Sequence, residues 1–255
     1  MKEFSMAGHS HWANIQHKKG IADAKRGKLW SKLSRLILIA ARSGGGDPIT
    51  NLKLRYAIDK ARAVSMPKDN IEYAIKKGTG ELEGLVMEEL TYEGFGPAGT
   101  AIMVELVTDN RNRTNGEIRK VFEKGGGNMG SSGCAAHFFE RKGVFSIDSK
   151  VADEEKLMNV ALDAGADDIK QEGDHFTVTC EPAAFSKVQD ALSKNNISTI
   201  SAEVSQIPKM QVDVDAEAAR KITKLLDALD DNDDVQNVYC NVNIPAEVLA
   251  EMEKG

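Results

Sequence analysis

Residues 144–206 carry the clearest pattern of secondary structure in this chain of 255 residues: VFSIDSKVADEEKLMNVALDAGADDIKQEGDHFTVTCEPAAFSKVQDALSKNNISTISAEVSQ. Segments rich in Val, Ile, Phe and Thr alternate with two segments whose apolar residues recur at helical spacing. The predicted order is strand (144–147), helix (154–164), strand (168–172), strand (177–181), helix (183–194) and strand (198–206). This β-α-β-β-α-β order predicts a ferredoxin-like domain, which we place at residues 141–209.

The segments on either side of this domain predict a second domain that it interrupts. Residues 90–95 and 100–107 have the composition of strands, a helix follows from about residue 114, and helix 216–229 and strand 235–242 come after the insertion. We therefore expect a discontinuous α/β domain of residues 83–140 plus 210–250. The acidic turn at 230–234 and a short helix from Pro245 suggest no chemistry. The fold class is α+β multidomain.

Three motifs in the α/β domain resemble ligand-binding motifs. Residues 94–99 spell G-x-G-x-x-G, but a strand follows instead of a helix, which predicts a hairpin loop and not a dinucleotide site. Thr114 and Glu117 have the spacing of a capping box, and Arg111 and Arg113 at that helix start either hold an anion or pair with nearby acids. The glycine-rich residues 125–133 lack the Lys-Ser/Thr of a phosphate loop, which favours a helix stop and a mobile loop.

The charge of the chain is strongly segregated. The formal net charge is −6, from 33 basic and 39 acidic residues. Residues 1–80 hold 16 Lys and Arg against 6 Asp and Glu, a net charge of +10, whereas the remainder carries −16. Such asymmetry indicates a nucleic-acid partner for the basic part. The basic part, residues 6–82, is predicted to be a separate three-helix domain, and residues 1–5 precede a second methionine and are left out.

The first predicted helix, residues 18–42, has an apolar face and a cationic stripe. Leu29, Trp30, Leu33, Ile37 and Ala40 recur at three- and four-residue spacing. The stripe on the other side consists of Lys25, Lys28, Lys32, Arg35 and Arg42, with Arg26 nearby. Basic residues are also found on solvated helix faces, but such faces normally interleave acids, and there are none between Lys25 and Asp47. We expect the stripe to bind phosphates, so that replacing Lys25, Lys28, Lys32 and Arg35 with Ala flattens the salt dependence of binding by up to roughly 3–4 log units per log unit of salt.

The segment before this helix is a candidate nucleotide-binding arm. It contains His9, His11, Trp12, Asn14, Gln16, His17, Lys18 and Lys19. These residue types stack on bases and bind phosphates, although solvated histidines without a ligand are an alternative. The two further predicted helices, 51–64 and 67–78, do not form a convincing major-groove reader, because the last one starts with Asp69 and Glu72.

Other functional classes receive little support. Cys134, Cys180 and Cys240 form no C-x-x-C pair, which is typical of a reducing cytosol and of neither disulfides nor a metal site. No apolar run approaches the length of a membrane span. His137 and His175 have no recognisable nucleophile beside them. We therefore expect a cytoplasmic protein that is not an enzyme, needs no cofactor and has no small-molecule substrate.

Several strings closely resemble the YebC/PmpR family over essentially the whole chain after Met6. They include Ala7-Gly8-His9-Ser10-His11-Trp12-Ala13-Asn14-Ile15, Met66-Pro67-Lys68-Asp69-Asn70-Ile71, Tyr92-Glu93-Gly94-Phe95-Gly96-Pro97 and Thr108-Asp109-Asn110-Arg111-Asn112-Arg113-Thr114. The resemblance implies a helical N-terminal domain, two α/β domains with one inserted in the other, and a cytoplasmic DNA-binding transcriptional regulator. Some relatives, including the mitochondrial translational activator, act at the ribosome. The alternative it implies is thus a translation factor that binds ribosomal RNA through the basic domain.

Overall fold

The computed structural model describes residues 23–83, 87–245 and 247–248. These residues form two compact units. The first contains the helical domain, a four-stranded sheet and residues 217–238; the second contains residues 136–216 and those from 239 onward. Within the described ranges, no helix is long and apolar enough to cross a membrane.

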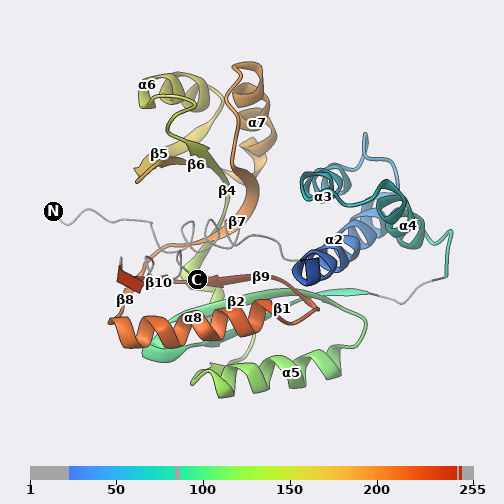
Figure 1. The fold of residues 1–255 in the computed structure, drawn as a ribbon, viewed down its shortest axis with the longest axis vertical. Coiled ribbons are helices and arrows are strands. Elements are labelled where there is room, and N and C mark those ends of the chain that lie inside the picture. The colour runs from blue at the N-terminus through green and yellow to red at the C-terminus, as the bar shows by residue number, and fades with distance from the viewer. Residues whose placement is uncertain (1–22, 84–86, 246, 249–255) are drawn as a thin grey trace. The chain divides into compact units, whose positions relative to one another are not determined.

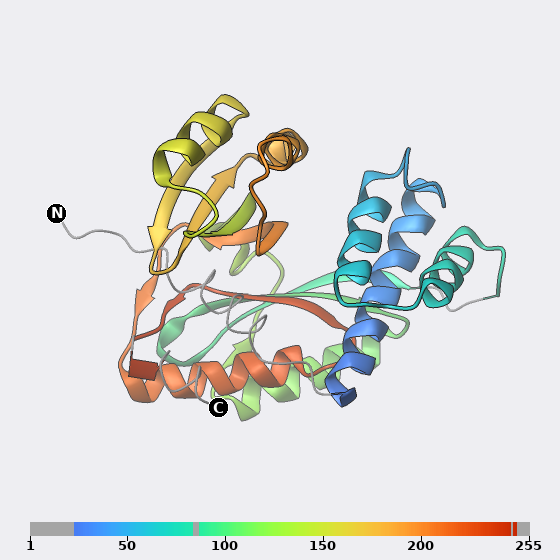
Figure 2. The same ribbon diagram turned by 45° about the horizontal axis from the view of Figure 1, so that its top comes forward.

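Three helices form the basic domain of the first unit: α2 (Asp23–Gly44), α3 (Leu52–Ala63) and α4 (Lys68–Thr79). In Figure 2 both α3 and α4 lie beside α2. Their core confirms the predicted apolar face of α2, with Leu33, Ile37 and Ala40 buried and Leu29 and Trp30 packed against them. Helix α3 contributes Leu54, Ala57, Ile58 and Ala61 to this core, and α4 contributes Ile71 and Ala74.

The ends of these helices follow local capping chemistry. The side chain of Asn51 caps α3 by accepting a hydrogen bond from the Leu54 amide at 3.1 Å. The prediction that the last helix ends at Gly78 is wrong, because α4 continues to Thr79 and is capped by Gly80 in the left-handed conformation. Gly78 instead permits close packing: a Cβ there would lie 2.4 Å from the Leu38 carbonyl oxygen and 2.7 Å from the Ala41 Cβ.

Gly78→Ala is expected to lower the free energy of unfolding by about 2 kcal/mol, because α2 and α4 would have to separate. Urea denaturation followed by circular dichroism measures this change. Gly116→Ala is the matched control, since a Cβ at Gly116 in a helix meets no atom within 4 Å. It should raise stability by about 0.5–1 kcal/mol, and equal effects at both positions would contradict this packing.

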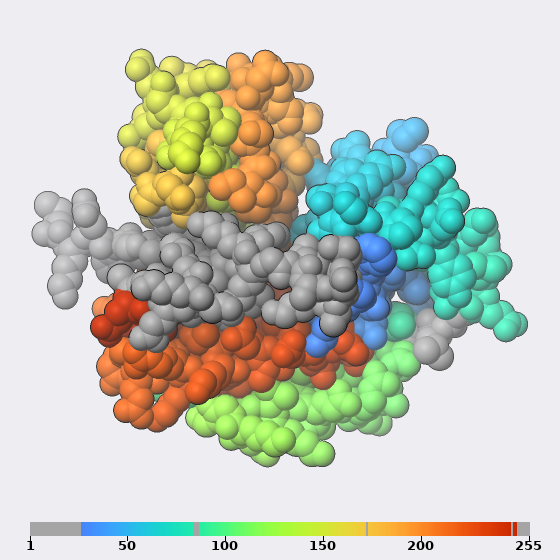
Figure 3. Space-filling model, in the orientation of Figure 1, coloured from blue at the N-terminus to red at the C-terminus, as the bar shows by residue number. Residues whose placement is uncertain are grey.

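The sheet of the first unit has the order β3-β1-β2-β9. Its strands are β1 (Glu88–Phe95), β2 (Ala101–Thr108), β3 (Asn128–Met129) and β9 (Val235–Cys240). Strand β9 extends the β1–β2 hairpin, although more than 100 residues of sequence separate it from β2. Helices α5 (Arg111–Lys124) and α8 (Ala216–Asp230) lie on the same face of this sheet (Figure 1). Their side chains adjoin in the space-filling view (Figure 3).

The motifs of this sheet have local structural roles. The G-x-G-x-x-G segment is a hairpin loop with a short 3-10 turn at Pro97–Gly99, as predicted. The predicted capping box is wrong: the N-cap of α5 is Asn110, whose side chain accepts a hydrogen bond from the Arg113 amide. Thr114 lies one turn inside the helix and is fully buried.

Helix α2 also packs on this sheet. Leu38 and Ile39 are buried with Val107 of β2, and Met87 packs against them. The helix is thus buried on two sides, by the other helices of the bundle and by the sheet. This packing explains why the helical domain and the sheet form one compact unit.

The second unit confirms the ferredoxin-like prediction. Its elements are β4 (Phe139–Asp148), α6 (Glu154–Leu157) continued by a π-helical turn at Met158–Leu162, β5 (Ala166–Glu172), β6 (His175–Cys180), α7 (Phe185–Lys194) and β7 (Ser201–Pro208). The sheet order is β5-β6-β4-β7, and all three strand pairs are antiparallel. Phe145 of β4 stacks on Phe185 of α7, with ring centroids 4.7 Å apart.

A short parallel pair follows in the same unit, formed by β8 (Val212–Asp213) and β10 (Val242–Asn243). The predicted helix after Pro245 lies largely outside the described residues.

Candidate nucleic-acid interface

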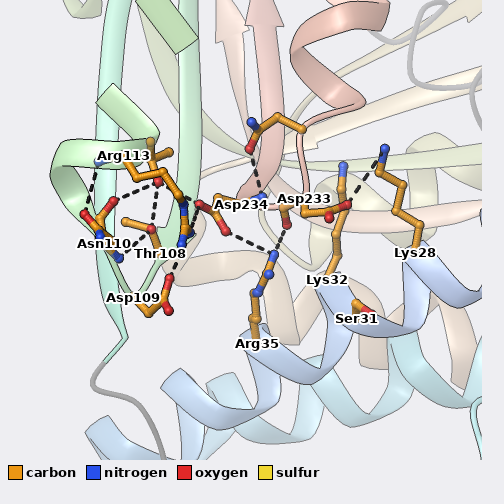
Figure 4. Close-up of polar contacts among 12 residues, drawn as sticks. Lys28, Ser31, Lys32, Arg35, Thr108, Asp109, Asn110, Arg113, Asp233 and Asp234 are labelled. Atoms are coloured by element: carbon orange, nitrogen blue, oxygen red, sulfur yellow. Dashed lines mark hydrogen bonds and ion pairs between the residues drawn. The ribbon is translucent and has the colours of Figure 1, made fainter. Parts of the chain in front are cut away.

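Three of the predicted phosphate-binding residues lie on one face of α2. Lys28, Lys32 and Arg35 are spaced four and three residues apart, so they project from the same side of the helix. All three reach the turn between α8 and β9, and Figure 4 shows the contacts of Lys28 and Arg35 with this turn. This acidic turn, residues 230–234, contains four aspartates and Asn232.

The two lysines bind the turn through both a backbone carbonyl and a carboxylate. The Lys32 Nζ donates to the Asp230 carbonyl oxygen at 2.6 Å and lies 2.9 Å from Asp230 Oδ1. The Lys28 Nζ donates to the Asp231 carbonyl oxygen and lies 3.3 Å from Asp231 Oδ1. Because α8 ends at Asp230, these ammonium groups satisfy carbonyls that have no partner within the helix. Their positive charge also suits the negative end of the helix dipole.

Arg35 makes the third contact, with the buried end of the acidic turn. Its Nη1 donates to the Asp233 carbonyl oxygen and lies 3.4 Å from Asp234 Oδ1. The Asp234 side chain is only 5% exposed. The acidic partners of these cations thus range from the exposed Asp231 and Asp233 beside Lys28 to the buried Asp234 beside Arg35.

Asp234 is the centre of a buried polar network (Figure 4). Its Oδ2 accepts hydrogen bonds from Thr114 Oγ1 at 2.6 Å and from Arg113 Nη2 at 2.8 Å. Burial opposes ionisation of this carboxyl, but hydrogen bonds from Thr114, Arg113 and Thr108 and the charge of Arg35 outweigh it. The pKa of Asp234 therefore lies below its usual range. The network joins the start of β9, the start of α5, the end of β2 and helix α2.

Of the two predicted anion-binding arginines, Arg113 pairs with carboxylates of the chain itself. Its Nη2 lies 2.8 Å from both Asp234 Oδ2 and Asp109 Oδ1. Hydrogen bonds to Asp234 and then to Asp109 raise the pKa of the guanidinium further. Arg111 opens α5 and is exposed.

The structure describes the remaining predicted contact residues to different extents. His9, His11, Trp12, Asn14, His17, Lys18 and Lys19 lie outside the described residues. Lys25 and Arg26 lie in the first turn of α2, and only their backbone is described. Arg42 is exposed at the other end of α2, where its Nη1 donates to the Met87 carbonyl oxygen at 3.3 Å.

The glycine-rich segment after α5 is held by protein groups. It contains the short strand β3, which pairs with β1. The buried carboxylate of Glu93 accepts hydrogen bonds from the amides of Gly133 at 2.7 Å and Ala135 at 2.6 Å. Burial, and then the negative charge of Glu93, raise the pKa of the neighbouring Cys134 thiol. Across the described ranges, no group of three or more His, Cys, Asp or Glu side chains is arranged to hold a metal ion.

Comparison with known proteins identifies the family. Residues 10–81 match the model described as the TACO1/YebC protein N-terminal domain, and residues 87–242 match that of the TACO1/YebC second and third domain. The chain belongs to the TACO1/YebC family. The resemblance drawn from the sequence strings is thereby confirmed.

Relatives in this family are similar over nearly their whole length. The probable transcriptional regulatory protein GSU1074 of Geobacter sulfurreducens is 54% identical, covering 98% of this chain and 99% of its own. The probable transcriptional regulatory protein RB5500 of Rhodopirellula baltica is 53% identical, covering 96% and 100%. A crystal structure of the conserved hypothetical protein Aq1575 from Aquifex aeolicus superposes with a TM-score of 0.85 at 47% identity, covering 94% of this chain and 99% of that one.

Proposed function

We propose that this protein is a non-enzymatic, DNA-binding regulator of transcription that acts in the cytoplasm. The names of its TACO1/YebC relatives supply the regulatory role. The observation that carries DNA binding is the segregation of charge, with +10 on the first 80 residues and −16 on the rest. A basic domain attached to an acidic body directs a polyanion to the basic domain.

The proposed contacts lie on α2 and the segment before it. His9, His11, Trp12, Asn14, His17, Lys18 and Lys19 would form the arm, followed by Lys25, Arg26, Lys28, Lys32, Arg35 and Arg42. Lys28 and Lys32 already have acidic partners. In this proposal they reach DNA by exchanging aspartate carboxylates for phosphates, both of which are anionic oxygen acceptors.

A second candidate function is a translation factor that binds ribosomal RNA through the same domain. The observation that favours it is the surface of α4, the helix that would have to read bases. Its first turns expose Asp69 and Glu72, and the Lys68 Nζ lies 3.3 Å from Glu72 Oε1. Acidic side chains at these positions repel phosphates and disfavour a major-groove reader. Binding without sequence readout also suits structured RNA.

One experiment separates the two functions. Mobility shifts with a promoter fragment bound in cells and with a scrambled fragment measure sequence preference, and co-sedimentation with ribosomes measures ribosome binding. Tighter binding to the promoter fragment without ribosome retention supports the transcriptional proposal. Retention on ribosomes together with equal, weak binding to both DNAs would replace it with the translational one.

A further inference from the structure

The three ion pairs between α2 and the acidic turn differ in how accessible they are. At the outer end, the side chains of Asp231 and Asp233 are 79% and 69% exposed, and Lys28 is one-third exposed. The Lys32 side chain is buried, at 11% exposed, whereas its partner Asp230 is 41% exposed. At the inner end Asp234 is buried in its network. The outer pairs can therefore open while the inner pair stays in place.

The exposed ion pairs of Lys28 with Asp231 and Asp233 also contribute little to stability. Exposed ion pairs contribute little net stability, because water solvates the separated charges well. The turn offers Asp230, Asp231 and Asp233 to only two lysines at this end, so one carboxylate is always in excess. An incoming polyanion can therefore replace the exposed pairs of Lys28 at little cost in free energy, whereas the buried Lys32 must receive a phosphate in place of Asp230.

The groups that the turn presents resemble a nucleic-acid backbone. They are anionic oxygens and carbonyl oxygens, all acceptors, arranged along Lys28 and Lys32. These two lysines are one helical turn apart, about 6 Å along the axis. The same ammonium groups cannot satisfy the turn and a phosphate backbone together.

We propose that the acidic turn is an intramolecular competitor that occupies the nucleic-acid-binding cations of α2 in the unbound protein. A nucleic-acid strand displaces Asp230, Asp231 and Asp233 from Lys28 and Lys32, while the pair between Arg35 and Asp234 keeps the helix anchored. This inference rests on the proposed nucleic-acid binding through α2. It predicts a threshold: several linked phosphates displace the turn, whereas a single phosphate only exchanges one anion for another.

The test is to neutralise the turn without touching its buried residue. Asp230→Asn, Asp231→Asn and Asp233→Asn are combined in the full chain, and binding of a fluorescein-labelled DNA duplex of random sequence is measured by anisotropy. The expected result is binding about tenfold tighter than wild type, because neutralising the turn removes the ion pairs of Lys28 and Lys32. The milder Asp231→Asn/Asp233→Asn pair, whose side chains are mostly exposed, is expected to give about threefold and keeps the test valid if the triple variant unfolds.

The matched control removes three negative charges elsewhere. Glu155, Asp163 and Asp190 are exposed on the ferredoxin-like domain, and Glu155→Gln/Asp163→Asn/Asp190→Asn changes the net charge equally. An equal gain in affinity with this control would show a general charge effect and overturn the proposal. A labelled RNA duplex of the same sequence, tested in parallel, shows whether DNA or RNA displaces the turn more strongly.

A double-mutant cycle separates failure of this inference from failure of the proposed function. In a Lys28→Ala/Lys32→Ala background, neutralising the turn is expected to have no effect, because the competed cations are gone. A gain that persists in that background, or no gain in the wild-type background while Lys28→Ala/Lys32→Ala weakens binding, overturns the competitor alone. Absence of binding by the wild-type protein to both DNA and RNA overturns the proposed function and the competitor with it.

Discussion

Asp234→Ala is expected to lower the free energy of unfolding by about 3 kcal/mol. The carboxylate is buried and accepts hydrogen bonds from Thr114 and Arg113, and it lies beside Arg35. Its removal takes one acceptor from the buried Thr114 hydroxyl and one carboxylate each from Arg113 and Arg35. Urea denaturation followed by circular dichroism measures the change.

Asp231→Ala is the matched control, because it removes the same chemical group from the same turn at an exposed position. We expect a change within about 0.5 kcal/mol. If the two variants were equally stable, Asp234 would not be the centre of the network. The comparison does not depend on nucleic-acid binding.

The pH dependence of stability gives an independent check on Asp234. Its pKa is lowered in the folded protein, so its ionised form is favoured by folding. This contribution is fully present above the unfolded-state pKa of about 3.9 and is lost as the pH falls through the folded-state value. In the Asp234→Ala variant, the free energy of unfolding is expected to fall less steeply at acid pH, because the contribution of this carboxyl is absent. An unchanged acid-side profile would contradict the assignment.

Replacing Lys25, Lys28 and Lys32 with Ala is expected to flatten the salt dependence of DNA binding by up to about 2.7 log units per log unit of salt, near 0.9 for each lost phosphate contact. Between 50 and 200 mM salt, the variant would lose about 40-fold less affinity than wild type. Arg35, the fourth residue of the sequence-based prediction, is left unchanged because it contacts the buried Asp234. Anisotropy titrations at several salt concentrations measure the slope.

The control for this prediction removes three cations from the ferredoxin-like domain. Lys156, Lys187 and Lys194 are exposed there, and their replacement by Ala changes the net charge by the same amount. The slope of this control is expected to equal that of the wild type. A flattened slope in the control with an unchanged slope in the α2 variant would place the contact surface outside α2.

Much of the fold is predictable from residue periodicity because local patterns determine it. The alternation of strands and helices over residues 144–206 predicts the ferredoxin-like unit, and apolar spacing predicts the buried face of α2. Helix ends are less predictable. Glycine is typical of helix ends, but Gly78 allows close packing against Leu38 and Ala41. Threonine is typical of helix N-caps, but the Thr114 side chain belongs to the Asp234 network.

The acidic turn is the part of the site that the sequence does not reveal. Asp230 is 198 residues from Lys32, and no local pattern links them. The available signal is complementary charge: a stripe without acids on α2, and four aspartates in five residues after α8. Charge alone does not determine which aspartates of the turn pair with which basic residues of α2. That pairing depends on how β9 returns beside β2 and on how α2 packs on the same sheet.

Hydrogen–deuterium exchange of the full chain, with and without a DNA duplex, tests most directly whether α2 exchanges the acidic turn for nucleic acid. We expect slower exchange in peptides covering residues 23–35 of α2, together with faster exchange in the peptide covering residues 230–234, because the turn is released. Unchanged exchange in both peptides, with protection confined to the ferredoxin-like domain, would contradict it.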